Sequence, residues 1–241
     1  MNDAEIGLSL VIPAYNEEQA IEECVREADG VLARLGRRYE IIVVDDGSTD
    51  TTFERLRSLK TSVPSLRAVR FSLHRGQTTA MAAGFERARG AIVVTMDGDM
   101  QNDPADIPHL LDMMGEWDVV CGVREHRRDG FVRRASSAVA NVVRNRLTAE
   151  DIRDVGCTLR AYRASYLRRL KLFEGMHRFL PTLLKLEGAR VVEVSVRHRA
   201  RTKGTNKYGI ANRLFIGLRD LFAVRWMKSR YIRYEIKEEI K

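Results

Sequence analysis

The sequence predicts an α/β protein with a mainly parallel sheet flanked by helices. Short apolar runs rich in β-branched residues alternate three times with segments of helical spacing before a fourth apolar run begins at residue 91. Such alternation requires right-handed crossovers between parallel strands. Turns rich in Asp, Asn, Gly and Ser follow these runs, so polar side chains are expected at the carboxyl edge of the sheet, where open α/β sheets bind ligands.

The first half of the chain supplies the strands and helices of this alternation. Asn16 follows the first apolar run and is expected to cap the next helix, with Glu17 and Glu18 in its first turn. Gly36 is expected to end that helix. Strands are predicted at 8–12, 40–44, 66–71 and from 91, and helices at 17–35, 51–60 and 77–89.

Two carboxylates stand directly after the fourth strand. Asp97 and Asp99 are separated by Gly98, which lets the backbone bend where the strand ends. A lone D-x-D sequence is weak evidence, since acidic loops are common. Its place after a buried strand, with Gln101 nearby, favours a site for Mg²⁺ or Mn²⁺ held between the protein and a diphosphate.

The second half is predicted to continue the domain to residue 209 and to end in a separate helix and tail over 210–241. No strand or helix is predicted for residues 154–163, where polar and apolar residues are mixed. Helices are predicted at 105–115, 131–147, 164–171, 177–187 and 210–228, and strands at 117–122 and 190–198.

Charge is distributed unevenly along the 241 residues. The net charge is +8, yet residues 160–241 hold 21 Lys and Arg against 7 Asp and Glu, whereas residues 1–159 hold 20 against 26. The basic half therefore predicts an anionic partner, such as a phosphorylated substrate, anionic lipid or nucleic acid. The cysteines are odd in number and far apart, which argues for a reducing compartment and against a disulfide frame or zinc site: Cys24, Cys121 and Cys157.

Neither a signal peptide nor a bilayer-spanning segment is expected from the sequence. The predicted helix over 210–228 is amphipathic and basic. This pattern is typical of either an interfacial membrane helix or a terminal helix packed on the core. Its expected apolar stripe comprises Ala211, Phe215, Leu218, Phe222 and Trp226. Its expected cations are Arg213, Arg219, Arg225 and Lys228.

Two loops also suggest phosphate or nucleotide binding. Residues 73–80 lead into a helix rich in Ala and Gly, which predicts either close approach to a nucleotide or tight packing on the sheet. Residues 199–209 are strongly cationic, and Gly204 and Gly209 bracket cations and Tyr208 in a form suited to wrapping phosphate. The glycine-rich signatures of dinucleotide oxidoreductases and P-loop ATPases are absent from the sequence.

Three ordered motifs resemble those of family 2 glycosyltransferases with the GT-A fold. They are Val-Ile-Pro-Ala-Tyr-Asn-Glu at 11–17, Val-Val-Asp-Asp-Gly-Ser-Thr-Asp at 43–50 and Met-Asp-Gly-Asp-Met-Gln at 96–101. Further segments are similar to the polyprenyl-phosphate branch, which includes dolichyl-phosphate mannose synthases and undecaprenyl-phosphate aminoarabinose transferases. These segments are 76–77, 83–85, 97–108, 154–163 and 201–208, and the resemblance spans about residues 8–228.

This resemblance implies inverting transfer of a sugar from a nucleotide diphosphate sugar to a lipid phosphate. The implied nucleotide site comprises Pro13, Ala14, Tyr15, Glu17, Asp45, Asp46, Gln77 and Asp97. The implied divalent-metal site comprises Asp97, Asp99 and Gln101, with Asp97, Asp99 and Arg201 central to catalysis. The groups implied to meet the acceptor phosphate or the donor diphosphate are Arg124, Arg133, Ser137, Arg201 and Lys207.

The chain departs from the branch at two points. Asn206 replaces the usual Ser of the G-x-S-K loop, and the transmembrane helices of many bacterial relatives do not follow here. Membrane attachment is therefore expected through the basic amphipathic helix or a membrane partner subunit, or else the acceptor is not a long lipid. The enzyme is expected to be peripheral on the cytoplasmic face of the membrane and to serve envelope synthesis. The neighbourhood of Gly76 and Gln77 favours a UDP-sugar over GDP-mannose.

Other functions remain open at this point. A family 2 transferase acting on a glycan hydroxyl would need a general base, for which Asp154 is the candidate, whereas an anionic phosphate acceptor needs none. A nucleic-acid-binding protein would use the basic half, although its cations form no recognisable recognition helix, zinc finger or RNA-binding motif. A catalytically silent partner subunit is disfavoured by the intact D-x-D sequence.

Overall fold

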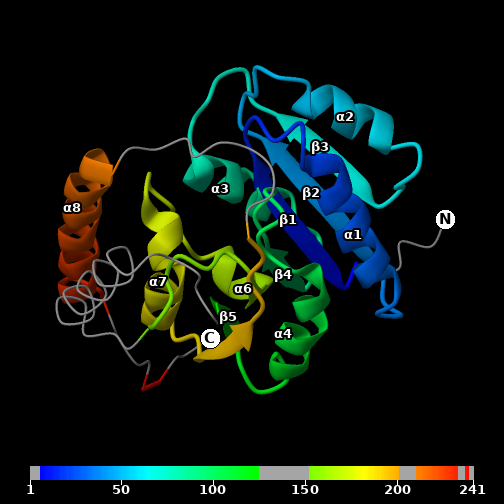
Figure 1. Cartoon of the computed structure of the whole chain (residues 1–241). Coiled ribbons are helices and arrows are strands. Elements are labelled where there is room, and N and C mark those ends of the chain that lie inside the picture. Colours follow the sequence, from blue (N-terminus) through cyan, green and yellow to red (C-terminus); the bar gives the residue numbers. More distant parts are fainter. Residues whose placement is uncertain (1–5, 125–151, 201–209, 233–236, 239–241) are drawn as a thin grey trace.

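A mixed sheet of seven strands forms the centre of the molecule (Figure 1). The computed structural model describes residues 6–124, 152–200, 210–232 and 237–238. The strand order is β3-β2-β1-β4-β6-β5-β7, and only β6 runs antiparallel to its neighbours in this sheet. The strands are β1 (Leu8–Ala14), β2 (Tyr39–Asp45), β3 (Leu66–Arg70), β4 (Ile92–Thr95), β5 (Val119–Arg124), β6 (Arg160–Arg163) and β7 (Val191–Val196).

Helices cover both faces of the sheet, as the alternating sequence predicts. The α-helices are α1 (Ile21–Ala33), α2 (Thr52–Leu59), α3 (Gln77–Arg87), α4 (Ile107–Met113), α6 (Ala164–Leu167), α7 (Leu180–Leu186) and α8 (Ile210–Ser229). The described residues also form two 3-10 helices, η1 (Pro104–Asp106) and η2 (Met176–Phe179). Among the described residues, none of these helices combines the length and the apolar character needed to cross a membrane.

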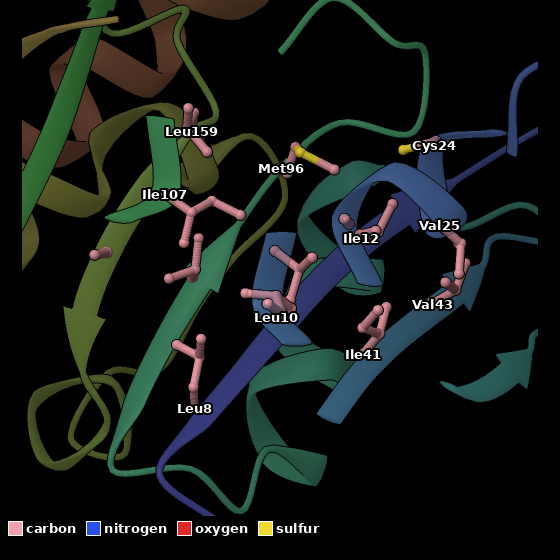
Figure 2. Close-up of a cluster of buried hydrophobic side chains, with 14 of the residues drawn as sticks. Leu8, Leu10, Ile12, Cys24, Val25, Ile41, Val43, Met96, Ile107 and Leu159 are labelled. Atoms are coloured by element: carbon pink, nitrogen blue, oxygen red, sulfur yellow. The ribbon is translucent and has the colours of Figure 1, made fainter. Parts of the chain in front are cut away.

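The two faces of β1 carry two different cores. Leu8, Leu10 and Ile12 belong to the larger cluster, which α1 and α4 cover with residues such as Val25 and Ile107 (Figure 2). Val11 faces the opposite side and packs under α3. This alternation follows from the two-residue period of a strand, and burial on both faces explains why the run reads as continuously apolar.

The predicted close packing of α3 is confirmed at one residue. A side chain at Gly84 would place its Cβ 2.3 Å from Cγ1 of Val11, so only glycine lets α3 lie this close to β1. The small residue at this position therefore serves helix–sheet packing. The other predicted role of the segment, close approach to a ligand, would involve the residues at its amino end.

Several predictions about the elements are wrong. The helix expected at 105–115 is divided into η1 and α4, because Asp103 accepts from Ala105 N at 3.0 Å and starts a short 3-10 turn. The helix expected at 164–171 ends at Leu167. Strand β6 was missed, since four residues paired on both edges give too short a sequence pattern.

Asn16 does not cap the first helix, which begins only at Ile21. Its backbone has φ of 50°, and its Oδ1 accepts from the backbone N–H of Thr49 at 2.8 Å. Asn16 N in turn donates to Oγ of Ser48 at 2.9 Å. The residue therefore joins the turn after β1 to the turn after β2, a contact between residues far apart in sequence that local spacing does not reveal.

Candidate active site

The polar turns predicted from the sequence meet at the carboxyl edge of the sheet. β1, β2 and β4 are parallel, so the residues after Ala14, Asp45 and Thr95 leave the sheet at the same edge. Asp45 is fully buried and accepts from the N–H of Ser48 at 2.9 Å, while Nε of Arg70 lies 3.3 Å from its other oxygen. Asp45 thus supports the turn after β2 from inside.

Asp46 holds the loop that leads into α3. Its carboxylate accepts from the backbone N–H groups of Arg75 at 2.7 Å and Gly76 at 2.8 Å, and Nδ1 of His74 lies 2.8 Å away. The His74 ring stacks on Tyr15 with centroids 4.0 Å apart and planes 25° apart. Stacked aromatic rings of this kind offer a face on which a nucleobase can stack, while the buried carboxylate of Asp46 holds the loop that carries His74.

Glycine is required at position 47 for this arrangement. Gly47 has φ of 72°, and a Cβ there would lie 2.6 Å from the backbone of Leu73. The turn after β2 and the loop before α3 therefore touch backbone to backbone. This contact holds the second motif, residues 43–50, against the loop that leads into α3.

Asp97 and Asp99 follow β4 at the same edge. Oδ1 of Asp97 accepts from Nε2 of Gln77 at 2.9 Å, and its N–H donates to Oδ1 of Asn102 at 3.0 Å. Oδ1 of Asp99 accepts from the N–H of Gln101 at 3.1 Å. Met100 has φ of 67°, so the loop turns sharply after the second carboxylate. The D-x-D segment is thus held by side chains from α3 and from its own loop.

The electrostatics of this pair favour a bound cation. Burial, and after it the neighbouring charge of Asp99, raise the pKa of Asp97 to about 6, while a hydrogen bond with Thr158 and the charge of Arg124 oppose the shift. A carboxylate whose ionised form is disfavoured by burial and by a second carboxylate is stabilised when a divalent cation lies between them.

The donor set fits Mg²⁺ or Mn²⁺ bound jointly with a ligand. Carboxylate oxygens are the hard donors that both ions prefer, and Mg²⁺ is usually held by one or two carboxylates plus phosphate oxygens and water. The described part of the chain has no cluster of three or more acidic, His or Cys side chains that could hold a metal alone. Asp97 and Asp99 could supply part of such a coordination, together with oxygen atoms of a ligand and water.

Arg124 and Asp154 form a close pair beside the D-x-D segment. Nε and Nη2 of Arg124 donate to the two carboxylate oxygens of Asp154 at 2.7 and 2.8 Å. A Cβ at Gly156 would lie 2.7 Å from Nη2 of Arg124, so the loop before β6 packs directly on the guanidinium. Both oxygens of Asp154 are therefore engaged by a cation, which makes it a poor candidate for the general base.

Arginines at the end of β7 anchor the chain just before the cationic loop. Arg199 N donates to the carbonyl of Gln101 at 2.9 Å, and its guanidinium pairs with Glu27 at 2.7 Å and Asp103 at 2.9 Å. Arg197 pairs with Asp106 at 2.8 Å. These contacts fix residues 197–199 beside the D-x-D loop, so the chain enters the segment 201–209 next to the candidate metal site.

The structure brings most predicted site residues together. Pro13 and Ala14 lie at the end of β1, Tyr15 and Glu17 in the turn that follows, and Arg124 at the end of β5. The charge of Glu17 also raises the pKa of Asp97, after the larger effects of burial and of Asp99. Four predicted residues lie outside the described part of the chain: Arg133, Ser137, Arg201 and Lys207.

Two residues of the site were missed from the sequence. His74 stacks on Tyr15, and its position two residues before Gly76 was the available signal. Oδ1 of Asn102 accepts both from Asp97 N and from Thr158 Oγ1, the latter at 3.1 Å, so it ties the D-x-D loop to the segment before β6. Its nearness to Asp99 in sequence gave no sign of this second contact.

Known proteins resemble this chain over nearly its whole length. Dodecaprenyl-phosphate galacturonate synthase from Rhizobium johnstonii is 40% identical over 238 residues, which are 96% of this chain and 69% of that protein. Undecaprenyl-phosphate 4-deoxy-4-formamido-L-arabinose transferase from Edwardsiella ictaluri is 37% identical over 206 residues, 84% of this chain and 63% of the relative. The chain thus spans only about two thirds of these relatives.

Solved structures share the fold at low sequence identity. Glucosyl-3-phosphoglycerate synthase from Mycobacterium tuberculosis, in complex with Mn²⁺, UDP-glucose and phosphoglyceric acid, gives a TM-score of 0.70 at 22% identity, covering 96% of this chain and 82% of that one. The mannosyltransferase PcManGT from Pyrobaculum calidifontis, in complex with GDP-Man and Mn²⁺, gives 0.65 at 20% identity, covering 96% and 66%. Both matches confirm the predicted fold.

The family model of glycosyl transferase family 2 matches residues 9–171, more than half of the chain. The matched segment contains the turns after β1 and β2 and the D-x-D loop, which are the parts that meet at the carboxyl edge of the sheet. The resemblance of the three motifs is therefore confirmed, and the chain belongs to glycosyl transferase family 2.

Proposed function

We propose that the protein transfers a sugar, with inversion, from a nucleotide diphosphate sugar to a polyprenyl phosphate, using Mg²⁺ or Mn²⁺. The observation that carries this proposal is the partly buried Asp97 crowded by Asp99, on the same sheet edge as the stacked pair of Tyr15 and His74. A nucleobase on the stacked rings and a metal-bound diphosphate on the carboxylates would place one nucleotide sugar across both. The two relatives named above, whose names specify polyprenyl-phosphate products or acceptors, support the acceptor class.

The nucleotide would lie along the ends of β1, β2 and α3. Tyr15 and Asp46 would face the base, while Gln77 would orient Asp97 toward the diphosphate through its 2.9 Å hydrogen bond. The metal, when bound, would neutralise charge on the departing nucleoside diphosphate. The proposed donor and metal residues are Pro13, Ala14, Tyr15, Glu17, Asp45, Asp46, Gln77, Asp97, Asp99 and Gln101.

A phosphate acceptor agrees with the pairing of Asp154. A phosphate monoester is already anionic near neutral pH, so attack needs positioning of two anions more than a general base. Arg124 is held in place by Asp154 and its charge lowers the pKa of Asp97, after the larger effects of burial and Asp99, so it lies where it can attract an anion. Arg133, Ser137, Arg201 and Lys207 are proposed to complete the phosphate contacts.

Transfer to a glycan hydroxyl is less well supported. That reaction needs a carboxylate to remove the hydroxyl proton. Both carboxylate oxygens of Asp154 already accept hydrogen bonds from Arg124, so neither is available as the base in this arrangement. A nucleic-acid-binding role has no support from the fold, which matches glycosyltransferases.

The position of α8 supports a peripheral location on the cytoplasmic membrane face. Phe222 and Trp226 are 60% and 65% exposed, and Ile232 beyond the helix is 81% exposed. Arg225 is also exposed on this helix. Aromatic residues among cations suit the boundary between lipid headgroups and acyl chains. Residues 210–241 would thus serve as a membrane-contacting unit beside the catalytic domain of 1–209, with or without a membrane partner subunit.

One experiment tests the acceptor and the donor together. The purified chain is incubated with Mn²⁺, undecaprenyl phosphate and a panel of UDP-hexoses, UDP-uronates, UDP-pentoses and GDP-mannose, and glycosyl-lipid products are measured by mass spectrometry. We expect one UDP-sugar to give a polyprenyl-phosphate sugar, and EDTA to abolish the product. Transfer to a free sugar hydroxyl but not to the lipid phosphate would contradict the proposal.

The membrane proposal has its own test. Sedimentation with anionic vesicles should retain the wild-type chain, and Trp226→Ser together with Phe222→Ser should reduce the bound fraction several-fold without changing UDP binding. Equal sedimentation of the wild type and the double variant would show that this face does not contact lipid.

A further inference from the structure

Helix α8 rests on the body of the protein through one face. Leu221 and Val224 are buried in a small cluster with Met176 and Phe179 of η2 and with two leucines of α7. In Figure 1, α8 accordingly lies beside α7. Phe222 is exposed, so it lies on the face of α8 that does not pack on η2.

Asp220 makes the tightest contact in this interface. It is 4% exposed, and a Cβ placed on Gly175 would lie 2.2 Å from its Oδ2. Gly175 has φ of 83° and directly precedes η2. The carboxylate of α8 thus lies against the backbone of this turn with no room for a side chain between them.

The same turn is bonded to α3. The N–H of Gly175 donates to Oγ1 of Thr78 at 3.0 Å, and Oγ1 of Thr78 lies 2.7 Å from Nδ1 of His177. Burial, and after it the charges of Arg178 and Arg160, lower the pKa of His177 to about 3, so the ring is neutral. Oγ1 of Thr78 thus accepts from Gly175 and shares a second hydrogen bond with Nδ1 of His177, whose direction depends on the tautomer of the ring.

His177 is itself fixed from the other side. Its carbonyl accepts from Nη1 of Arg160 at 3.3 Å, and Nη2 of that buried arginine donates to the carbonyl of Val155 at 2.7 Å. The hydroxyl of Thr78 is therefore held between two backbone-anchored groups. This geometry leaves it little freedom to rotate.

Thr78 directly follows Gln77, the first residue of α3, whose amide holds Asp97. A continuous series of contacts thus runs from Asp220 on α8 through Gly175 to Thr78, and from there to Gln77 and Asp97. The proposed reaction does not explain the contacts of Thr78 and Asp220, since neither residue belongs to the proposed donor or metal sites.

We propose that Thr78 is a positioning residue that sets the amide of Gln77 on Asp97, and that Asp220 of α8 maintains this setting through Gly175. The metal and nucleotide site would then depend on how α8 is seated. The identity of the ligand in this proposal rests on the proposed function, but the mechanical connection does not.

A double-mutant cycle tests the part played by Thr78. The affinity of the full-length protein for UDP with Mn²⁺ is measured by calorimetry for wild type, Thr78→Val, Gln77→Ala and the double variant. We expect Thr78→Val to weaken binding at least fivefold in the wild-type background and less than twofold when Gln77 is already alanine. Thr78→Ser, which keeps the hydroxyl, should restore binding. Equal losses in both backgrounds would overturn the proposal.

A matched pair of glycines tests the part played by α8. Gly175 and Gly188 have similar φ values of 83° and 87°, but a Cβ at Gly188 would meet nothing within 4 Å. Alanine at either position costs the same backbone strain, and only Gly175→Ala displaces Asp220. Hydrogen exchange at the first turn of α3 should therefore accelerate at least fivefold in Gly175→Ala and stay unchanged in Gly188→Ala. Identical exchange in the two variants would refute the connection.

The exchange measurement needs no nucleotide, so the two proposals fail separately. A wild-type protein that binds no UDP with Mn²⁺ would overturn the proposed function, and the exchange result would still decide the connection from α8 to α3. A wild-type protein that binds UDP while Gly175→Ala and Gly188→Ala exchange alike would overturn the connection alone.

Discussion

Buried carboxylates occur at both edges of the sheet, but their surroundings differ. At the amino edge, Glu40 at the start of β2 accepts from Oγ of Ser9 at 2.7 Å and from the N–H of Arg89 at 2.8 Å, and it pairs with Arg67. Asp118 precedes β5 and pairs with Arg163 and Arg190, each at 3.1 Å. Each of these carboxylates is matched by cations and backbone donors.

At the carboxyl edge, the balance is reversed. Asp97 is partly buried beside Asp99, and desolvation followed by the charge of Asp99 raises its pKa to about 6. Burial also raises the pKa of Asp118, but hydrogen bonds from Arg190 and Arg163 outweigh it, so that pKa falls below its ordinary value. One edge therefore satisfies its charges for stability, and the other keeps an excess of negative charge that a cation can relieve.

The largest expected effect is the loss of turnover in Asp99→Asn. Removing one preorganised electrostatic group typically costs about 100-fold or more in kcat, or about 2.7 kcal/mol. The thermal stability of the metal-free protein should not fall, because the variant relieves repulsion with Asp97. Activity assays and thermal unfolding check both statements, and Asp112→Asn, an exposed carboxylate on α4, is the matched control. Near-normal turnover in Asp99→Asn with metal present would contradict the site assignment.

Glu40→Ala should show the opposite pattern. The variant leaves the hydroxyl of Ser9 and the N–H of Arg89 without their acceptor, which we expect to lower the free energy of unfolding by about 2 kcal/mol. The folded fraction should retain wild-type kcat. Urea unfolding and kinetics at low temperature measure the two quantities. A loss of kcat in the folded protein would contradict the assignment of Glu40 to stability and not to catalysis.

The pH dependence should also differ between the edges. The pKa of Asp97 is raised from 3.8 to about 6 in the folded state, so ionising it costs stability as pH rises through this window, and metal binding must displace a proton. We expect Mn²⁺ to bind about tenfold more tightly at pH 7.5 than at pH 5, from the ionised fraction of a group with that pKa. Calorimetry with UDP present gives the affinities.

Two controls sharpen the pH measurement. Asp99→Asn should move the midpoint for metal binding to lower pH, because it removes the neighbouring charge that raises the pKa of Asp97. Asp118, whose pKa is lowered, contributes stability at neutral pH that is lost as pH falls through its depressed folded-state pKa. Mn²⁺ affinity independent of pH between 5 and 7.5 would argue against Asp97 as a ligand.

The smallest expected effects come from a tyrosine at each edge. Tyr39 begins β2 and donates to Oδ1 of Asp29 at 2.8 Å, so Tyr39→Phe should lower the free energy of unfolding by about 1 kcal/mol and leave UDP binding unchanged. Tyr15 follows β1 and stacks on His74, so Tyr15→Leu should weaken UDP binding about fivefold with little effect on stability. Calorimetry and urea unfolding of both variants make the comparison, and exchanged outcomes would refute it.

Sequence reasoning predicted the strands well where long apolar runs are buried on both faces, as in β1 and β2. It failed at β6, whose four residues are held by pairing with β4 and β5 and not by a pattern of their own. It also placed Phe222 and Trp226 on one stripe of α8 with no means of deciding which face docks. The structure shows Leu221 and Val224 docked and that pair exposed.

The sequence by itself determined the alternation of strands and helices, the polar turns after the strands and the D-x-D carboxylates, because these depend on residues close together in the chain. Only the tertiary structure decided that Asn16 bonds to Thr49, that Arg124 occupies Asp154 and that Thr78 meets Gly175. Such contacts join residues about 30 to 100 positions apart. Burial and pairing by distant parts of the chain set them, and no local pattern encodes those.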